Sequence, residues 1–353
     1  MNFCGKFSIE ALVFIFLSNL RENNLKPNGN MKYSNFISSR CLNLVLQGKG
    51  DNEIVPDAII RRFRNYIKEA QEIWCVAIDT FHLMEKRSGT PYKLRIKPQL
   101  FAVDGIVFAG SLRISKEKRF IPLSVFSIYY LSVHLIDDLI ENPVKFCSKF
   151  SSTNNTGQKL RISLISFILH ASMASFKLFS LKFDKNINTK ASIENFPQKF
   201  MGSLSTQIKH LSLEKSKDLP PKEVLKIKQH HVSGEATSFI ADCLRLDNLY
   251  NERQYKHIKR ALFYLGSLTQ FTDDLRDYEE DKKNDNANLL ASMEKFFGER
   301  AKMTFIDWYL KEEQFMLNEF KQAGLKINYD LICAVPWYPL FMKRFISLLM
   351  KRF

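Results

Sequence analysis

The sequence predicts an all-α protein built as a single helical bundle. Apolar residues recur at three- and four-residue intervals through most of the chain, which is the period of amphipathic helices. Strand-like alternation is scarce, and the 353 residues include only 13 glycines and 11 prolines. No period of ~20–50 residues repeats, which excludes a solenoid. We therefore expect roughly ten helices in one domain, with a central cavity.

The helical pattern begins near position 55. The first fifty residues mix a short apolar segment with Asn, Lys and Gly, so residues 1–54 are assigned to a loosely attached N-terminal extension and 55–353 to the helical domain. Ile59, Phe63 and Ile67 open the first pattern. Similar patterns predict helices over 121–140, 160–181, 221–246, 254–280, 287–298 and 300–324, with connections at 151–157, 183–190 and 218–221.

Composition excludes several classes of protein. A content of 45% hydrophobic and 25% charged residues is typical of globular proteins and excludes a disordered chain. No run reaches the ~18–20 apolar residues of a membrane span. The six cysteines lack the clustered spacings of disulfide frameworks or zinc sites, which favours reduced thiols in the cytoplasm. A net charge of +15 suits a polyanionic partner: nucleic acid, an anionic membrane or a diphosphate.

A first acidic segment ends an otherwise apolar helix. Asp137, Asp138 and Glu141 are three or four residues apart, so all three carboxylates can gather on one patch. Pro143 then marks the helix boundary. Like charges close together at the negative end of a helix dipole are unfavourable. A bound cation is the simplest way to offset that cost.

A second acidic segment lies in the helix predicted over 254–280. Asp273, Asp277 and Asp281 follow at intervals of four, which would form a carboxylate stripe along one helical face. Basic residues accompany the stripe: Arg276, Lys282 and Lys283. Mg²⁺ prefers carboxylate and phosphate oxygens in octahedral geometry. Two such segments on facing helices predict a site for Mg²⁺ and a diphosphate, whereas either one alone would suit a solvated helix face.

These two segments resemble the paired aspartate motifs of class I (trans) isoprenoid synthases. The first is similar to the DDxx(x)D/E motif. The run from Gly266 through Gln270 to Asp277 resembles the second motif of polyprenyl diphosphate synthases. The overlapping run from Gln270 to Asp281 resembles the QxTNxxRDYxED pattern of squalene and phytoene synthases, and the aspartates also have the spacing of the terpene cyclase metal triad. The expected fold is therefore the helical bundle of that superfamily.

A third segment resembles the squalene and phytoene synthases. Residues 230–236, HHVSGEA, are similar to their HYVAG stretch, where the helix breaks near the reacting carbons. Ser233 and Gly234 would permit such a break, or simply close packing of two helices. The paired arginines of chain-elongating enzymes are missing after Glu141, and their anchor for isopentenyl diphosphate has only a faint counterpart in Lys93, Arg95 and Lys97.

The resemblance implies ionisation of an allylic prenyl diphosphate to make a terpenoid. It implies two or three Mg²⁺ ions, held by Asp137, Asp138, Glu141, Asp273, Asp277 and Asp281. It implies catalytic roles for Arg276 and Tyr278, and substrate contacts from Lys226, Lys228, Ser233, Gly234, Lys282 and Lys283. The favoured interpretation is a terpene synthase or a squalene/phytoene synthase-like enzyme that does not consume isopentenyl diphosphate. The alternatives are a chain-elongating polyprenyl diphosphate synthase and a catalytically silent, basic helical binding protein.

The distribution of charge also bears on contact with membranes and with nucleic acid. The segment 343–353 is amphipathic and basic, which predicts either peripheral membrane contact or a last helix docked on the bundle. Nucleic acid is not expected, because the most organised polar features are acidic and no basic-aromatic motif accompanies them. The predicted location is therefore the cytoplasm, with association at a membrane surface as an option.

Overall fold

The computed structural model describes residues 112–141, 198–203, 205–206, 218–245, 250–284 and 286–337, with single positions and pairs between 38 and 86. These residues are helical or lie in turns, and none of them forms a strand. The long helices are α7 (Lys116–Glu141), α13 (Ser233–Arg245), α14 (Glu252–Arg276) and α17 (Ala301–Gln322). Shorter helices are α12 (Pro221–Ile227), α15 (Tyr278–Asn284), α16 (Leu289–Phe297) and α18 (Tyr329–Ala334). The π-helix η3 (Lys228–Val232) joins α12 to α13, and the 3₁₀ turns η4 (Gly298–Arg300) and η5 (Val335–Trp337) complete the described elements.

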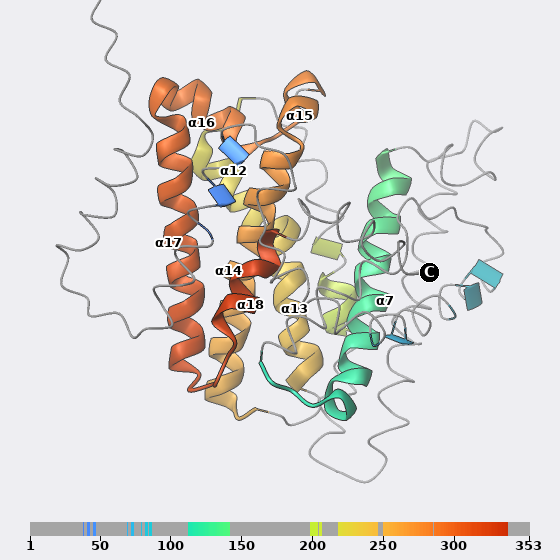
Figure 1. Cartoon of the computed structure of the whole chain (residues 1–353). Coiled ribbons are helices and arrows are strands. Elements are labelled where there is room, and N and C mark those ends of the chain that lie inside the picture. Colours follow the sequence, from blue (N-terminus) through green and yellow to red (C-terminus); the bar gives the residue numbers. More distant parts are fainter. Residues whose placement is uncertain are drawn as a thin grey trace, which may run out of the picture.

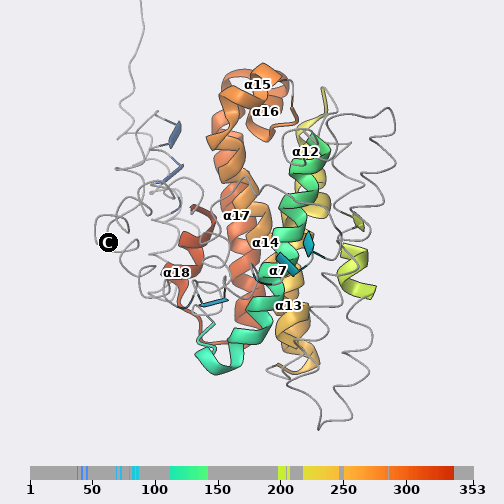
Figure 2. The ribbon, with the colours of Figure 1, turned by 90° about the vertical axis from the view of Figure 1, so that its right-hand side faces the viewer.

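Helix α14 is central to the described bundle. It packs against α13 on one side and α17 on the other, and α7 packs on α13 (Figure 1). In the view turned by 90°, the axes of α7, α13, α14 and α17 are roughly parallel or antiparallel (Figure 2). Large aromatic side chains fill the space between them. The ring centroids of Tyr129 and Phe239 lie 4.4 Å apart between α7 and α13, and those of Phe271 and Phe305 lie 5.0 Å apart between α14 and α17.

Local sequence signals set the helix ends. Asn251 and Gln254 form a capping box at the start of α14, because each side chain bonds the other's backbone N–H. The Asn288 side chain caps α16 by accepting from the backbone N–H of Ala291. Gly298, with φ of 56°, ends α16 in the left-handed region that side chains avoid. These signals fix the connection between α14 and α17, and therefore the position of the acidic end of α14.

The all-α prediction is confirmed. Helices α7, α16 and α17 lie where the apolar period places them, and a turn at 218–220 precedes α12. Two boundaries differ from prediction: the expected helix over 221–246 contains a π-helix, and the one over 254–280 is two helices that meet at Asp277. The helix predicted at 160–181, the connections at 151–157 and 183–190, and the basic tail at 343–353 lie outside the described residues.

The core extends to residues that precede the predicted domain boundary. Cys41 and Leu42 are helical and buried in the same apolar cluster as Phe305 and Trp337. The boundary at residue 55 stays a prediction, but the described positions before it already pack on the bundle. No helix among the described residues has the length and apolar content that crossing a membrane requires.

Ser38 from this early segment meets a buried carboxyl group on α17. Its hydroxyl donates a hydrogen bond to Glu313, whose side chain is almost entirely buried. Burial raises the pKa of Glu313 from 4.5 to about 7, although hydrogen bonds from Ser38 and Cys333 oppose the shift. The folded protein therefore holds this proton more tightly than the unfolded chain does.

We expect Glu313 to make stability fall as pH rises. Because its pKa is raised in the folded state, its favourable contribution is complete below pH 4.5 and is lost as the pH passes about 7. Over that range the free energy of unfolding should decrease by about 3 kcal/mol. Denaturant unfolding at several pH values should show a loss of stability with rising pH that is smaller by this amount in Glu313→Gln than in wild type. Glu299→Gln, at an exposed position, is the control and should follow wild type.

Candidate functional site

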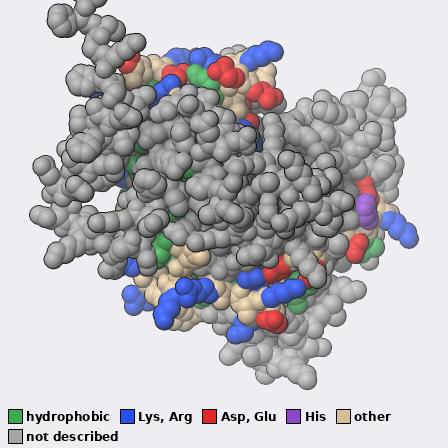
Figure 3. All heavy atoms as spheres, viewed as in Figure 1, with side chains coloured by type: hydrophobic (Ala, Val, Ile, Leu, Met, Phe, Trp, Pro, Cys, Tyr) green, Lys and Arg blue, Asp and Glu red, His purple; other side chains and the backbone are tan. Residues whose placement is uncertain are grey.

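The two acidic segments lie at the same end of the bundle. Helices α7 and α14 run in the same direction, and both views place their C-terminal ends at the end where α15 lies (Figures 1 and 2). Asp137, Asp138 and Glu141 belong to the last turns of α7, and their side chains lie outside the described part of the structure. At this end, the described surface carries both acidic and basic side chains (Figure 3).

Arg276 joins two of the predicted metal ligands. Its Nε and Nη2 donate to the two carboxylate oxygens of Asp277, at 2.8 and 2.5 Å. Its Nη1 lies 2.9 Å from Oδ1 of Asp273, one turn earlier on α14. The hydrogen bonds to Asp277 stabilise the charged guanidinium and so raise the pKa of Arg276 above its ordinary value.

Asp273 is only partly compensated by this arginine. Its Oδ1 is inaccessible to solvent and accepts no hydrogen bond of good geometry, although the side chain as a whole is 28% exposed. Burial raises the pKa of Asp273 from 3.8 to about 6, while Arg276 acts in the opposite direction. A buried carboxylate oxygen with so little hydrogen bonding fits a cation ligand, because a cation would replace the solvation that burial removed.

Asp274, the next residue, points into the protein. It is 2% exposed and lies 3.1 Å from the ammonium of Lys228, which is itself 9% exposed. It accepts hydrogen bonds from the backbone N–H of Leu289 at 2.8 Å and from the Gln270 amide at 3.2 Å. Burial raises the pKa of Asp274, and Lys228 opposes that shift. The predicted substrate contact Lys228 is thus engaged in a buried ion pair.

The third predicted carboxylate of the stripe, Asp281, lies beyond a bend. Helix α14 ends at Arg276, yet the backbone N–H of Asp277 still bonds the Asp273 carbonyl, and that of Asp281 bonds the Asp277 carbonyl, both at 2.8 Å. The backbone ladder of the three aspartates is therefore kept. The Asp281 side chain accepts from the amides of Asn286 and Asn288, at 3.2 and 2.9 Å, and so holds the connection to α16.

Tyr278 and Lys282 form a separate cluster with Glu294. The Tyr278 hydroxyl donates to Glu294, and the Lys282 ammonium donates to the Tyr278 hydroxyl at 3.0 Å. Lys282 also lies 5.2 Å from the centre of the Tyr278 ring. Lys283 is exposed. The structure therefore groups Arg276 with the carboxylates of α14, but it places Tyr278 and Lys282 against α16.

The HHVSG segment contains a π-helix. The backbone N–H of Ser233 bonds the carbonyl of Lys228, five residues earlier, which widens the helix by one residue. The Gln229 amide fixes this turn to two neighbouring helices, because it donates to Ser267 of α14 at 3.2 Å and to Glu312 of α17 at 2.8 Å. A Cβ at Gly234 would lie 2.2 Å from the Gln229 carbonyl oxygen, so the π-turn requires glycine there.

Gly266 of α14 packs against the same turn. A Cβ at Gly266 would lie 2.3 Å from the Ser233 carbonyl oxygen and 2.7 Å from the hydroxyl of Thr237. The backbones of α13 and α14 therefore approach each other directly beside Ser233. Both interpretations of the Ser-Gly pair, a helix break and close packing of two helices, apply to this structure.

We expect Gly266→Ala to destabilise the protein by about 1–3 kcal/mol, because α14 would have to move away from α13. The matched control is Gly202→Ala, at an exposed helical position where a Cβ would meet nothing within 4 Å. That variant should be neutral or more stable by up to about 1 kcal/mol, since alanine is the better helix former. Denaturant unfolding of the two variants measures the difference, and equal stabilities would contradict the close approach.

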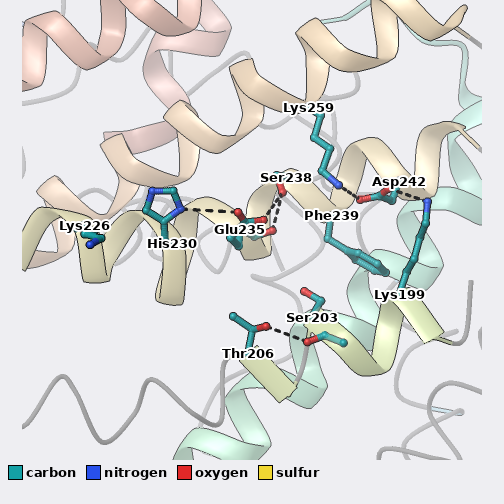
Figure 4. Close-up of a pocket in the computed structure, with 11 residues that line it drawn as sticks. Lys199, Ser203, Thr206, Lys226, His230, Glu235, Ser238, Phe239, Asp242 and Lys259 are labelled. Carbon is teal, nitrogen blue, oxygen red and sulfur yellow. Dashed lines mark hydrogen bonds and ion pairs between the residues drawn. The ribbon is translucent and has the colours of Figure 1, made fainter.

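A cavity of about 580 Å³ lies elsewhere, between α12, α13 and residues 199–206 (Figure 4). Lys226 and His230 line one end of it, and Asp242 lies at the other. Asp242 accepts from Tyr255 and Lys259, both at 2.7 Å, and lies 3.5 Å from Lys199. Asp273, Asp277 and Asp281, the predicted metal ligands whose side chains the structure describes, do not line this cavity. Of the predicted substrate contacts, Lys226 lies here.

The sequence did not reveal the partners that support the site. Asp274 looks like a second metal ligand, yet it falls three residues after the buried Phe271, on the face that carries Ser267 and Gln270. That periodicity was the available signal for a structural role. Gln229 and Glu312 carried no signal, because their contact joins residues 83 positions apart. Among the described side chains, no three acidic, His or Cys groups are arranged to hold a metal ion, and the α7 carboxylates fall outside that statement.

Comparison with known proteins identifies the fold. No protein-family profile matches the chain, and no curated protein matches its sequence. Among solved structures, a geranylgeranyl pyrophosphate synthetase from the archaeon Geoglobus acetivorans is similar over 80% of this chain and 98% of its own, with a TM-score of 0.50 and 13% identity. The alignment with a geranyltransferase from Helicobacter pylori covers 79% of this chain and 98% of that protein, at 11% identity. Its TM-score of 0.39 is too low to support a conclusion. The chain therefore has the all-α isoprenoid synthase fold.

Proposed function

We propose that this chain is a Mg²⁺-dependent prenyl diphosphate synthase, which joins an allylic diphosphate to isopentenyl diphosphate. The observation that carries the proposal is the common position of the acidic ends of α7 and α14 within this fold (Figure 1). The shared fold with a geranylgeranyl pyrophosphate synthetase favours chain elongation over the synthesis of a terpenoid from prenyl diphosphate alone, which the sequence favoured. The missing arginine pair after Glu141 is the feature that opposes it.

The carboxylates that would hold Mg²⁺ are Asp137, Asp138 and Glu141 of α7, Asp273 of α14, Asp277 at the junction of α14 and α15, and Asp281 of α15. The under-bonded Oδ1 of Asp273 fits this role, as does the all-oxygen set of donors. When bound, Mg²⁺ would neutralise the negative charge that develops on the departing diphosphate. In the present structure the Asp281 carboxylate also accepts hydrogen bonds from Asn286 and Asn288.

Helical periodicity supports the contribution of α7. Positions 137 and 141 follow Tyr130 by seven and eleven residues. At about 100° per residue, both positions return to within about 20° of the Tyr130 direction. Positions 137 and 141 therefore share one face of α7 with Tyr130, two to three turns further along.

The protein's own side chains would perform three further tasks. Arg276, which is 40% exposed, would bind diphosphate oxygens through its planar guanidinium. Lys228 would keep Asp274 neutralised and α14 fixed against the π-helix. The stacked rings of Phe126 and Tyr130, whose centroids are 5.7 Å apart, would supply an aromatic surface below the carboxylates, where it can exclude water and stabilise an allylic cation.

The test is incubation of the purified protein with Mg²⁺, an allylic diphosphate and radiolabelled isopentenyl diphosphate. We expect label in a longer prenyl diphosphate, together with release of inorganic diphosphate. The second candidate is a single-substrate terpenoid synthase, which the π-helix at Lys228–Val232 favours because the sequence there resembles the breaking helix of squalene and phytoene synthases. It would release diphosphate without incorporating label. Absence of diphosphate release with geranyl, farnesyl and geranylgeranyl diphosphates would contradict both and leave the silent binding protein.

A further inference from the structure

We propose that Arg276 is a built-in counter-ion of the metal site, so that a divalent cation and a diphosphate bind cooperatively by exchanging partners with its guanidinium. The cation would take over the carboxylates of Asp273 and Asp277, and the guanidinium would pass from those carboxylates to the diphosphate. The inference rests on the proposed function, because it concerns the same metal and diphosphate site.

The contacts of Arg276 show that it competes directly for the ligand atoms. Three of its nitrogens lie 2.5–2.9 Å from three carboxylate oxygens, two on Asp277 and one on Asp273. A divalent cation held by these carboxylates would bind oxygens that the guanidinium now contacts. The two cations would repel each other at such short range. Metal binding therefore requires Arg276 to withdraw, at least from one of the two aspartates.

Withdrawal of Arg276 is compatible with the rest of the fold. The side chains of Arg276 and Asp277 are 40% and 37% exposed, so the guanidinium can leave without opening the core. Lys228 could not replace it, because its ammonium is 9% exposed and pairs with Asp274 on the buried side of α14. Arg276 forms ion pairs with both Asp273 and Asp277.

This exchange links the two ligands. Without diphosphate, the cation must displace the three contacts of Arg276 with Asp273 and Asp277, and the guanidinium is then solvated by water alone. With diphosphate present, the displaced guanidinium gains phosphate oxygens, which it binds in the same forked geometry. Each ligand should therefore raise the affinity for the other by the same factor, as linkage requires. Removing the guanidinium should raise the affinity for the metal alone and reduce the coupling.

The experiment measures Mn²⁺ binding to the full chain by calorimetry, with and without inorganic pyrophosphate. Arg276→Gln removes the charge and leaves a shorter, polar side chain. Arg253→Gln, at an exposed position at the other end of α14, is the matched control for net charge. Circular dichroism confirms folding of each variant. We expect Arg276→Gln to bind Mn²⁺ alone about tenfold more tightly than wild type, which corresponds to about 1.4 kcal/mol. Arg253→Gln should resemble wild type.

The outcomes separate this inference from the proposed function. Pyrophosphate should raise the affinity for Mn²⁺ less in Arg276→Gln than in wild type, and this result would support the counter-ion role. Equal or weaker Mn²⁺ binding by Arg276→Gln, with wild type binding Mn²⁺ in the presence of pyrophosphate, would overturn the counter-ion role and leave the metal site intact. Absence of Mn²⁺ binding by every variant, with pyrophosphate present, would overturn the metal site and the counter-ion together.

Discussion

Asp277→Asn and Asp138→Asn should each lower the rate of diphosphate release by about two to three orders of magnitude. Each substitution removes one carboxylate charge from the site that would hold Mg²⁺, and a preorganised electrostatic contact to a developing charge has an effect of this size. Asn keeps the shape of Asp, so packing should not change. The measurement is diphosphate release from an allylic diphosphate under saturating Mg²⁺, with unfolding followed in parallel.

A matched carboxylate on the same short helix provides the control. Glu279 is exposed on α15, next to Tyr278, and belongs to none of the predicted ligand sets. Glu279→Gln should keep the wild-type rate, although it removes the same charge from the same end of the bundle. Wild-type turnover in both aspartate variants would contradict the metal assignment. An equal loss of activity in Glu279→Gln would show that the loss in the aspartate variants is a general effect of charge.

The helical fold could be predicted from sequence because it depends on local periodicity. Apolar residues at helical spacing predict α7 and α17 closely, since each helix buries one face in the bundle. The bend at Asp277 could not be predicted in the same way. The residues on either side of it continue the helical pattern, and Asp281 is held by Asn286 and Asn288 from a connection whose path depends on tertiary contacts.

The position of a helix break near the π-helix could be predicted from sequence, but the contacts that stabilise the π-helix could not. The Ser233-Gly234 pair indicated that the helix could break, but it did not show what holds the break in place. Gln229 does so, through Ser267 and Glu312 on two other helices. These contacts join distant parts of the chain, so one sequence carries no local signal for them. The likeness to solved structures likewise concerns the fold, because 13% identity leaves the site residues to be tested individually.

The same substitution at the adjacent residues Asp273 and Asp274 should change the free energy of unfolding by very different amounts. Asp274→Asn leaves the Lys228 ammonium buried without its carboxylate, 3.1 Å away in the present structure. Breaking a buried pair in this way costs about 3–5 kcal/mol, because the remaining charge is uncompensated. Asp273→Asn should change stability by less than about 1 kcal/mol, since Asp273 is partly exposed and its ion pair is with Arg276, an exposed arginine.

Denaturant unfolding of a double-mutant cycle separates the ion pair from packing. Lys228→Met in the Asp274→Asn background removes the stranded charge and should recover part of the lost stability, whereas independent effects would add. Lys228→Met alone should cost less than Asp274→Asn alone, because the Asp274 carboxyl keeps the donors Leu289 and Gln270 and can also take up a proton. The pKa of Asp274 is already raised by burial, which makes that protonation easier. If both aspartate variants lose the same stability, the assignment of Asp273 to the ligand site and Asp274 to the core is wrong.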